Sequence, residues 1–288
     1  LAAHCDVPEP RMEILLRAGA ALGLLKTRRD GRYGLARKGA ALTGVPGLAA
    51  MIRHHEVLYR DLADPVAFFR DGTATELAQF WPYVFGAAQA EAPETAQRYS
   101  KLMADSQLLV ADDTLDAVSL RGVSRLMDVG GGTGVFLGQA ASRYPQLAMT
   151  VFDLPAVVAG VPVDDSRFSG RLETVGGSFR DDPLPDGADA ISLIRVLYDH
   201  SDDTVRDLLA SVFRALPPGG RLIISEPMTG SRAGDAYFSL YTLAMQTGRT
   251  RASAEIAALC AAAGFVDARA PRARRPFITS VLTARKPR

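Results

Sequence analysis

Two aspartates stand before and after a glycine-rich stretch in the middle of the chain. The stretch reads Asp128-Val-Gly-Gly-Gly-Thr-Gly134, and Asp153 follows it in Phe152-Asp-Leu-Pro155. Glycines let the backbone turn tightly, so that a ligand can lie against bare main chain where the next helix begins. Asp153 comes 23 residues after Gly130, at the end of an apolar run, which suits a carboxylate that binds both hydroxyls of a ribose. These residues predict a site for a cofactor that contains a nucleoside.

The position of Asp128 distinguishes between such cofactors. Dinucleotide-binding turns read G-x-G-x-x-G and face a pyrophosphate, which an acid directly before the glycines would repel. The same acid would attract the ammonium group of an amino-acid tail. S-adenosylmethionine (SAM) carries such a tail, a ribose and no phosphate, so we expect SAM as the cofactor and S-adenosylhomocysteine (SAH) as its product. A nicotinamide or flavin cofactor and a purely structural turn are the alternatives.

Composition excludes several other classes of protein. The 288 residues are 48% hydrophobic and 23% charged, with a net charge of +1, which is typical of a globular protein and gives no general argument for nucleic acid. Cys5 and Cys260 form neither a disulfide framework nor a metal-ligand spacing, which favours a reducing cytoplasm and no metal. No apolar run reaches the roughly 18 residues of a membrane span. The chain begins Leu1-Ala-Ala-His, in a stretch that reads as part of an amphipathic helix, so we expect that further residues precede it.

The N-terminal part, residues 1–118, reads as helices with one small hairpin. Apolar residues from Met12 to Leu22 recur at helical spacing. Asp30-Gly31 then predicts a hairpin with a two-residue turn. Helices and hairpin together predict a winged-helix domain. Its expected recognition helix carries only Arg11 and Arg17 as basic groups, so we expect dimerisation or a substrate lid rather than binding of nucleic acid.

Residues 119–288 alternate between short apolar runs and helical stretches. This alternation predicts an α/β domain with a doubly wound, Rossmann-like parallel sheet. The expected strands are 126–129, 150–152, 172–175, 190–194, 221–225 and 277–284.

Five motifs occur in the order of a known family. They are D-V-G-G-G-T-G at 128–134, F-D-L-P at 152–155, G-G-S-F at 176–179, A-L-P-P-G-G at 215–220 and A-A-A-G-F at 261–265. Together they resemble the caffeate and hydroxyindole O-methyltransferase group of class I SAM-dependent methyltransferases. The N-terminal part is similar to the dimerising winged-helix domain of that group. The resemblance implies a homodimeric, metal-free O-methyltransferase with a Rossmann-like methyltransferase sheet.

The resemblance also implies which residues bind SAM, and all of them fall at or just beyond expected strand ends. Asp153 would bind the ribose, while Ser178 and Phe179 would flank the adenine. The family usually has an acid at the position of Ser178, which could bond the adenine amine more strongly than a hydroxyl. Arg195 would help to fix the cofactor, or else is a surface cation. The full set is Asp128, Gly130, Gly132, Asp153, Leu154, Ser178, Phe179 and Arg195.

The catalytic motif departs from the family. Plant-type members read His-Asp-Trp-Ser-Asp, in which the His removes the hydroxyl proton, whereas this chain reads Tyr198-Asp-His-Ser-Asp202. Glu226 retains the family's acid after the fifth strand, but the second orienting acid falls near Thr250. A tyrosine, with a pKa of about 10, is a poor base near pH 7. We therefore expect Tyr198 to orient the acceptor hydroxyl or relay its proton, with His200 as the alternative base.

The loss of the full His–Glu pair argues against an acidic, catechol-like acceptor and favours a hydrophobic alcohol. Met103, Gln107, Tyr241 and Met245 are expected to bind it. Further apolar residues would line a long pocket, or else form domain-interface core: Phe68, Phe69, Phe80, Trp81, Tyr83, Phe85 and Phe238. The motif around Tyr198 resembles the branch of the family that serves bacterial photosynthetic pigments. This implies a carotenoid acceptor of the hydroxyneurosporene or demethylspheroidene type, and peripheral contact with a membrane that holds it.

Two other functions remain open at this point. One is O-methylation of a phenolic polyketide or a bacteriochlorophyll-type pigment. The other, from a different class, is a catalytically silent SAM-binding regulator that acts through its winged helix, since the His and one acid are missing.

Overall fold

The structure is a computed structural model that describes residues 1–70, 74–80, 93–272 and 278–288. It divides into two compact units, Leu1–His54 and His55–Arg288.

The first unit consists of a helix, a hairpin and a second helix, of which the first helix and the hairpin were expected. A 3-10 turn η1 (Ala3–Cys5) precedes α1 (Glu9–Ala21), and β1 (Leu25–Thr27) pairs antiparallel with β2 (Tyr33–Leu35) before α2 (Arg37–Gly44). The hairpin turn differs from the two-residue prediction, because the Arg28 amide bonds to the Arg32 carbonyl and leaves three residues in the loop. Gly31, at φ 76°, takes the left-handed position that such a loop requires.

The second unit begins within a series of helices. These are α3 (Leu48–Asp61), α4 (Pro65–Phe69), α5 (Glu76–Phe80) and α6 (Pro93–Ala117). The C-terminal half of α6 belongs to the core of the sheet domain, since Val110, Ala111 and Leu115 are buried in a cluster with α7. This packing joins α6 to the compact unit that holds the sheet, while the expected domain boundary near Val118 stays a prediction.

A seven-stranded sheet forms the centre of the second unit. Its order is β5-β4-β3-β6-β7-β9-β8, with β9 antiparallel to both of its neighbours and β3 to β7 all parallel. The strands are β3 (Arg125–Val129), β4 (Ala148–Asp153), β5 (Leu172–Gly176), β6 (Ala190–Ile194), β7 (Arg221–Glu226), β8 (Val266–Arg269) and β9 (Ser280–Arg285). The doubly wound α/β prediction is confirmed.

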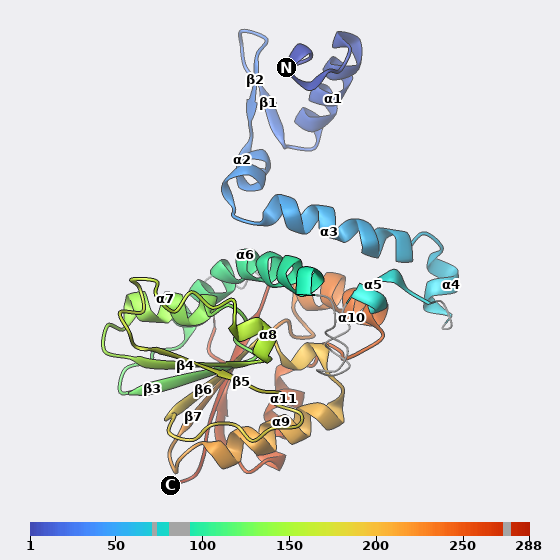
Figure 1. The fold of residues 1–288 in the computed structure, drawn as a ribbon. Coiled ribbons are helices and arrows are strands. Elements are labelled where there is room, and N and C mark those ends of the chain that lie inside the picture. Colours follow the sequence, from blue (N-terminus) through green and yellow to red (C-terminus); the bar gives the residue numbers. More distant parts are fainter. Residues whose placement is uncertain (71–73, 81–92, 273–277) are drawn as a thin grey trace. The chain divides into compact units, whose positions relative to one another are not determined.

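Helices cover both faces of this sheet (Figure 1). The helices that follow β3 in the sequence are α7 (Val135–Arg143), α8 (Pro155–Val158), α9 (Asp202–Ala215), α10 (Ser239–Met245) and α11 (Ser253–Ala262). A 3-10 turn η4 (Leu197–Asp199) and a π-helical turn η5 (Gly234–Phe238) lie between them. α6 and α7 pack on one core cluster, and α9 and α11 on another. Among the described residues, no helix is both long and apolar enough to span a membrane.

Two strands depart from the sequence prediction. β8 was not predicted, because all four of its residues are exposed at the sheet edge and show no apolar alternation. β9 begins at Ser280, and the expected start at Phe277 lies outside the described residues. The expected pocket residues Trp81, Tyr83 and Phe85, and the side chain of Phe80, also lie outside the description.

The chain winds in opposite directions from the centre of the sheet. β3 lies between β4 and β6, so the strand order reverses at the β3–β6 boundary. Open parallel sheets bind ligands beyond the carboxyl ends of their strands at such a reversal. Gly130, Asp153, Arg195 and Glu226 stand at or directly after the carboxyl ends of β3, β4, β6 and β7. The fold therefore gathers the predicted site residues at one edge.

Candidate active site

The glycine turn after β3 is built around close backbone contacts. The Gly130 amide donates to the Phe152 carbonyl at 2.8 Å, which ties the turn to the end of β4. Gly130, Gly132 and Gly134 all have φ between 57° and 77°, a conformation that glycine adopts without strain. A Cβ on Gly130 would lie 2.8 Å from Val196, whereas one on Gly132 would meet no atom within 4 Å. Open space beside Gly132 fits a ligand that lies against the main chain.

Asp153 holds the turn from the neighbouring strand. Its Oδ2 accepts the Gly132 amide at 2.8 Å and its Oδ1 accepts the Leu154 amide at 2.7 Å. Burial raises the pKa of Asp153 despite these two hydrogen bonds. Each carboxylate oxygen retains a second acceptor site, so the group can still accept the two hydroxyls of a ribose.

Asp128 lies beneath the same turn. It is buried on β3, and its Oδ1 accepts the Ser192 hydroxyl at 2.6 Å. Burial and the charge of Asp153 raise the pKa of Asp128 to about 7. Two carboxyls that disfavour each other's charge would both be stabilised by a nearby cation. The ammonium group and ribose hydroxyls of SAM therefore fit the chemistry of this pair.

The expected adenine side lies after β5. The Ser178 hydroxyl donates to Asp181 Oδ2 at 2.8 Å, so it is already engaged in a local turn. Phe179 packs edge-to-face on His200, with ring centroids 5.2 Å apart. The structure therefore brings His200 together with the residues predicted to flank the adenine.

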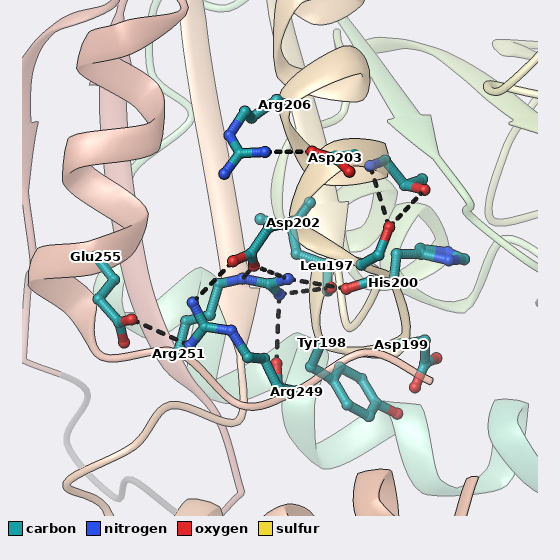
Figure 2. A network of polar contacts seen from close by, with 12 residues as sticks. Leu197, Tyr198, Asp199, His200, Asp202, Asp203, Arg206, Arg249, Arg251 and Glu255 are labelled. Carbon is teal, nitrogen blue, oxygen red and sulfur yellow. Dashed lines mark hydrogen bonds and ion pairs between the residues drawn. The ribbon is translucent and has the colours of Figure 1, made fainter. Parts of the chain in front are cut away.

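The contacts of His200 disfavour a role as base. Arg180 Nη2 lies 3.0 Å from His200 Nδ1, and a guanidinium can only donate, so Nδ1 accepts and the neutral ring carries its proton on Nε2. Burial, Arg180 and Arg251 lower the pKa of His200 to about 3. A ring with this pKa takes up a proton reluctantly near pH 7. Figure 2 also shows the His200 ring pointing away from that of Tyr198.

Glu226 holds the turn that carries Tyr198. Its Oε1 accepts the amides of Val196 and Leu197 at 2.9 and 2.8 Å, and its Oε2 accepts the amide of Tyr198 at 3.3 Å. The carboxyl is 1% exposed, and burial raises its pKa to about 7. Glu226 thus acts on the backbone of the catalytic turn through both of its oxygens.

Arg251 holds the same turn from its carbonyl side (Figure 2). Its Nη1 donates to the Leu197 carbonyl at 2.9 Å and its Nη2 to the His200 carbonyl at 2.8 Å. Asp202 accepts from Arg251 Nε and Nη2 at 2.9 and 2.7 Å, which fixes the guanidinium. The turn from 196 to 200 is therefore bound to a carboxylate on one side and to a guanidinium on the other.

The loop before Arg251 fits closely against this turn. Gly248 has φ 66°, and a Cβ there would lie 2.1 Å from the Tyr198 carbonyl oxygen. Thr247 Oγ1 donates to the Asp199 carbonyl at 3.1 Å. Thr250, at the position of the family's second acid, bonds to Thr229 and Ser239, so a hydroxyl network stands in that place.

The expected acceptor residues fall into two groups. Arg195 Nη1 donates to Ser106 Oγ at 2.9 Å and to Gln107 Oε1 at 3.3 Å, and Nη2 lies 3.9 Å from Met103 Sδ. Arg195 thus meets the predicted substrate residues of α6, although the sequence assigned it to the cofactor. Tyr241 and Met245 pack in a separate cluster that includes Phe68. Phe238 meets the ring of Tyr198 edge-to-face at 5.5 Å, whereas Phe69 is exposed.

Sequence reasoning missed three residues that the structure places in the site. Ser192 sits opposite Asp128 in the sheet register, and a polar residue in the apolar run of β6 was the available signal. Arg251 is 2% exposed, but a single arginine in a loop carries no signal of burial. Asp199 lies within the motif beside Tyr198, but its residue type alone predicted no role.

No metal site accompanies these groups in the described ranges. In that part of the chain, no three His, Cys, Asp or Glu side chains are placed to hold a metal ion.

The strand order of this sheet, together with its glycine turn and two aspartates, is the arrangement of the class I SAM-dependent methyltransferases.

Comparison with known proteins identifies the family. The sequence matches the O-methyltransferase domain over residues 59–266. It is 57% identical to demethylspheroidene O-methyltransferase of Rhodobacter capsulatus, over 99% of this chain and 72% of that protein. The enzyme of the same name from Cereibacter sphaeroides is 54% identical, over 100% of this chain and 77% of that protein. The chain belongs to the O-methyltransferase family.

Solved structures agree with this assignment. Human N-acetylserotonin methyltransferase in complex with SAM has a TM-score of 0.82 and 27% identity, over 100% of this chain and 86% of that one. A methyltransferase of calicheamicin biosynthesis, bound to SAH, has a TM-score of 0.81 and 25% identity, over 100% of this chain and 86% of that one. The protein is thus a SAM-dependent O-methyltransferase, and the alternative of a silent regulator is not favoured.

Proposed function

We propose that this enzyme methylates the hydroxyl of a hydrophobic carotenoid with SAM as the methyl donor. The observation that carries the proposal is the identity of 57% and 54% to two enzymes named demethylspheroidene O-methyltransferase, in alignments that cover nearly the whole chain. The Phe238 ring that packs on Tyr198, and the apolar cluster of Phe68, Tyr241 and Met245, support an acceptor that is held by shape.

The cofactor would be held by the glycine turn and its two acids. When bound, SAM supplies an electrophilic methyl group on a sulfonium. Asp153 and Leu154 would hold the ribose, and Asp128 with Gly130 and Gly132 would hold the amino-acid tail. Phe179 would pack on the adenine together with His200, which touches Phe179. Ser178 would contribute from the same turn.

On the acceptor side, the enzyme positions an oxygen rather than forcing its early deprotonation. Tyr198 is buried, with its ring against Phe238, so its hydroxyl can hold the acceptor oxygen in one place. Correct placement of reacting atoms supplies much of the rate of such a transfer. Met103 and Gln107 would bind the acceptor from α6, with Arg195 holding them, while Tyr241 and Met245 would bind it from α10.

Purified enzyme with labelled SAM tests the proposal. We expect methyl transfer to a carotenoid that carries a tertiary hydroxyl, and little transfer to caffeate. Efficient transfer to caffeate, to a phenolic polyketide or to a bacteriochlorophyll-type pigment, without transfer to the carotenoid, would replace the acceptor and leave the enzyme class intact.

We also propose that the enzyme is a homodimer whose interface is built from residues before about Val118. Apolar side chains in the first unit support this, since Ile14 and Leu15 of α1, Leu22 directly after α1, and Leu35 of β2 are each about half exposed or more. Several exposed apolar side chains in one small unit favour a protein partner. Analytical ultracentrifugation should give a dimer at micromolar concentration, and an Ile14→Glu variant should shift it towards monomer.

A carotenoid acceptor resides in a lipid phase, so we propose that the enzyme contacts a membrane surface peripherally from the cytoplasmic side. Flotation with vesicles that contain the carotenoid tests this. We expect the protein to float with loaded vesicles more than with empty ones, and no flotation with either would remove the proposal.

A further inference from the structure

We propose that Asp199 is the final acceptor of the proton that leaves the substrate hydroxyl, with Tyr198 as the relay between them. This inference rests on the proposed function, in that it concerns the proton of the same O-methylation. It addresses the loss of the family's His, because a tyrosine by itself has no base to which it can pass a proton.

The placement of Asp199 fits this role. Asp199 is 8% exposed, and its Oδ1 has no hydrogen-bond partner among the described residues. The Tyr198 side chain is hydrogen-bonded to this carboxyl, and Figure 2 shows the carboxyl beside the hydroxyl end of the Tyr198 ring. A buried carboxylate oxygen without a donor is costly, so a reason for retaining it is required. Acceptance of a proton during each turnover is such a reason.

The charges around Asp199 make it a better base than an ordinary aspartate. Burial and the nearby charge of Glu226 on β7 raise its pKa well above the usual value, while Arg195 after β6 and the hydrogen bond from Tyr198 lower it. The two raising effects dominate. A higher pKa gives the carboxylate a stronger attraction for a proton as long as it is ionised in the resting enzyme.

The other candidate bases at this site are already engaged. Both oxygens of Glu226 accept backbone amides of the turn. His200 accepts from Arg180 through Nδ1 and has a pKa of about 3. Among the carboxyl and imidazole groups of this turn and of the strand beside it, Asp199 is the one that combines burial, an unpartnered oxygen and contact with Tyr198.

The proposed step balances in atoms and electrons. A lone pair of the acceptor oxygen forms the new O–C bond, and the S–C bond breaks with its electron pair returning to sulfur. As the O–C bond forms, the O–H group becomes strongly acidic. Its proton passes to the Tyr198 oxygen while the Tyr198 proton passes to Asp199, so no tyrosinate has to form. The products are an ether, SAH and a neutral Asp199, which later releases its proton to water.

An Asp199→Asn variant tests the relay, with Asp203→Asn as the matched control. Asp203 lies four residues away with its side chain 91% exposed, and it takes no part in the site. We expect Asp199→Asn to lower kcat by about a hundredfold, as loss of a general base typically does, with SAM affinity unchanged. Asp199→Glu should recover part of the loss, and Asp203→Asn should match the wild type.

A double variant distinguishes a relay from two separate contacts. We expect Tyr198→Phe to lower kcat by about ten- to a hundredfold, and Tyr198→Phe with Asp199→Asn to be no worse than Asp199→Asn alone. Fully additive losses would contradict the relay. Wild-type turnover in Asp199→Asn, or a large loss of SAM affinity there, would overturn it as well.

Infrared titration of the resting protein gives a readout that does not depend on knowing the acceptor. The carboxyl band removed by Asp199→Asn should titrate above the usual range of an aspartate. Tyr198→Phe should raise that pKa further, because the phenol hydrogen bond lowers it. A band that titrates unchanged in Tyr198→Phe would sink the relay, whereas failure of carotenoid methylation with these shifts intact would affect only the proposed acceptor.

Discussion

The cofactor edge and the catalytic turn are held by the same device, which is a buried carboxylate that accepts backbone amides. Asp153 accepts two amides within and beside the glycine turn. Glu226 accepts three amides, all of them from the turn at 196–198. The difference lies in what each carboxylate has left for a ligand. Asp153 bonds to the amide of Gly132, which borders open space, whereas Glu226 is enclosed, with Arg251 on the other side of its turn.

This difference separates two tasks. At the cofactor edge the carboxylate both shapes the turn and can bind the ligand. At the turn from 196 to 200, Glu226 and Arg251 hold the backbone, which leaves the side chains of Tyr198 and Asp199 for the chemistry that we propose. Positioning and reaction are therefore divided among different side chains on the acceptor side.

Removal of the Glu226 carboxylate should have the largest effect and should spare the cofactor edge. We expect Glu226→Ala to lower kcat on the order of a thousandfold, because three buried amides lose their acceptor and the turn moves. Glu226→Gln should cost less, since its oxygen can replace Oε1 while its NH₂ cannot accept from Tyr198. Calorimetry should find SAM affinity within about twofold of wild type in both variants. A large loss of SAM affinity would break the separation of the two regions.

Asp153→Ala should show the converse pattern. We expect it to weaken SAM binding by on the order of 2–3 kcal/mol, because charge-assisted hydrogen bonds to the ribose are lost. At saturating SAM, kcat should stay close to wild type. The control is Asp164→Ala, which removes an exposed aspartate that follows Asp153 in the sequence. Unchanged SAM affinity on titration of Asp153→Ala would refute the assignment of the ribose site.

Arg251 and Arg249 form a matched pair for the catalytic turn. Both contact Asp202, but only Arg251 donates to the Leu197 and His200 carbonyls. We expect Arg251→Lys to lower kcat about tenfold, since a single ammonium cannot replace the planar fork. Arg249→Lys should change it little, because this ion pair is nearly half exposed. Equal effects of the two variants would mean that the salt bridge, rather than the carbonyl contacts, positions the turn.

The two regions were not equally predictable from the sequence. The cofactor edge depends on residues close together in the chain, with Gly132 and Asp153 only 21 residues apart, and on glycines whose backbone role is local. The catalytic turn depends on Glu226 and Arg251, which reach it from 28 and 54 residues away. Tyr198 could be read from the motif, but the partners of its backbone could not.

The elements of the fold were likewise predictable only where a local pattern in the sequence marked them. The alternation of buried strands and helices was sufficient for the parallel sheet, because β6 is apolar or small throughout and fully buried. β8 was missed since its exposed edge residues lack an apolar pattern. The core role of α6 was missed because its contacts with α7 are tertiary, and helical periodicity does not say which domain a helix joins.

The pH dependence of stability should also distinguish the two regions directly. The pKa of Asp128 rises from its ordinary 3.8 to about 7 in the folded protein. Between these values the folded state binds more protons than the unfolded state, so this group's contribution to stability is lost as pH rises. Wild-type stability should fall with pH relative to Asp128→Asn, by at most about 1.4 kcal/mol per pH unit. His200 acts in the opposite direction below pH 6.5 but is common to both proteins, so their difference isolates Asp128.

Saturating SAM should flatten this difference between wild type and Asp128→Asn, because an ammonium beside Asp128 favours its ionised form. The same comparison for Glu226→Gln, over the window from 4.5 to about 7, should not respond to SAM. Urea unfolding at several pH values, with and without SAM, measures both. A SAM response at Glu226 that equals the one at Asp128 would show that the two carboxylates share one electrostatic environment rather than serving separate sites.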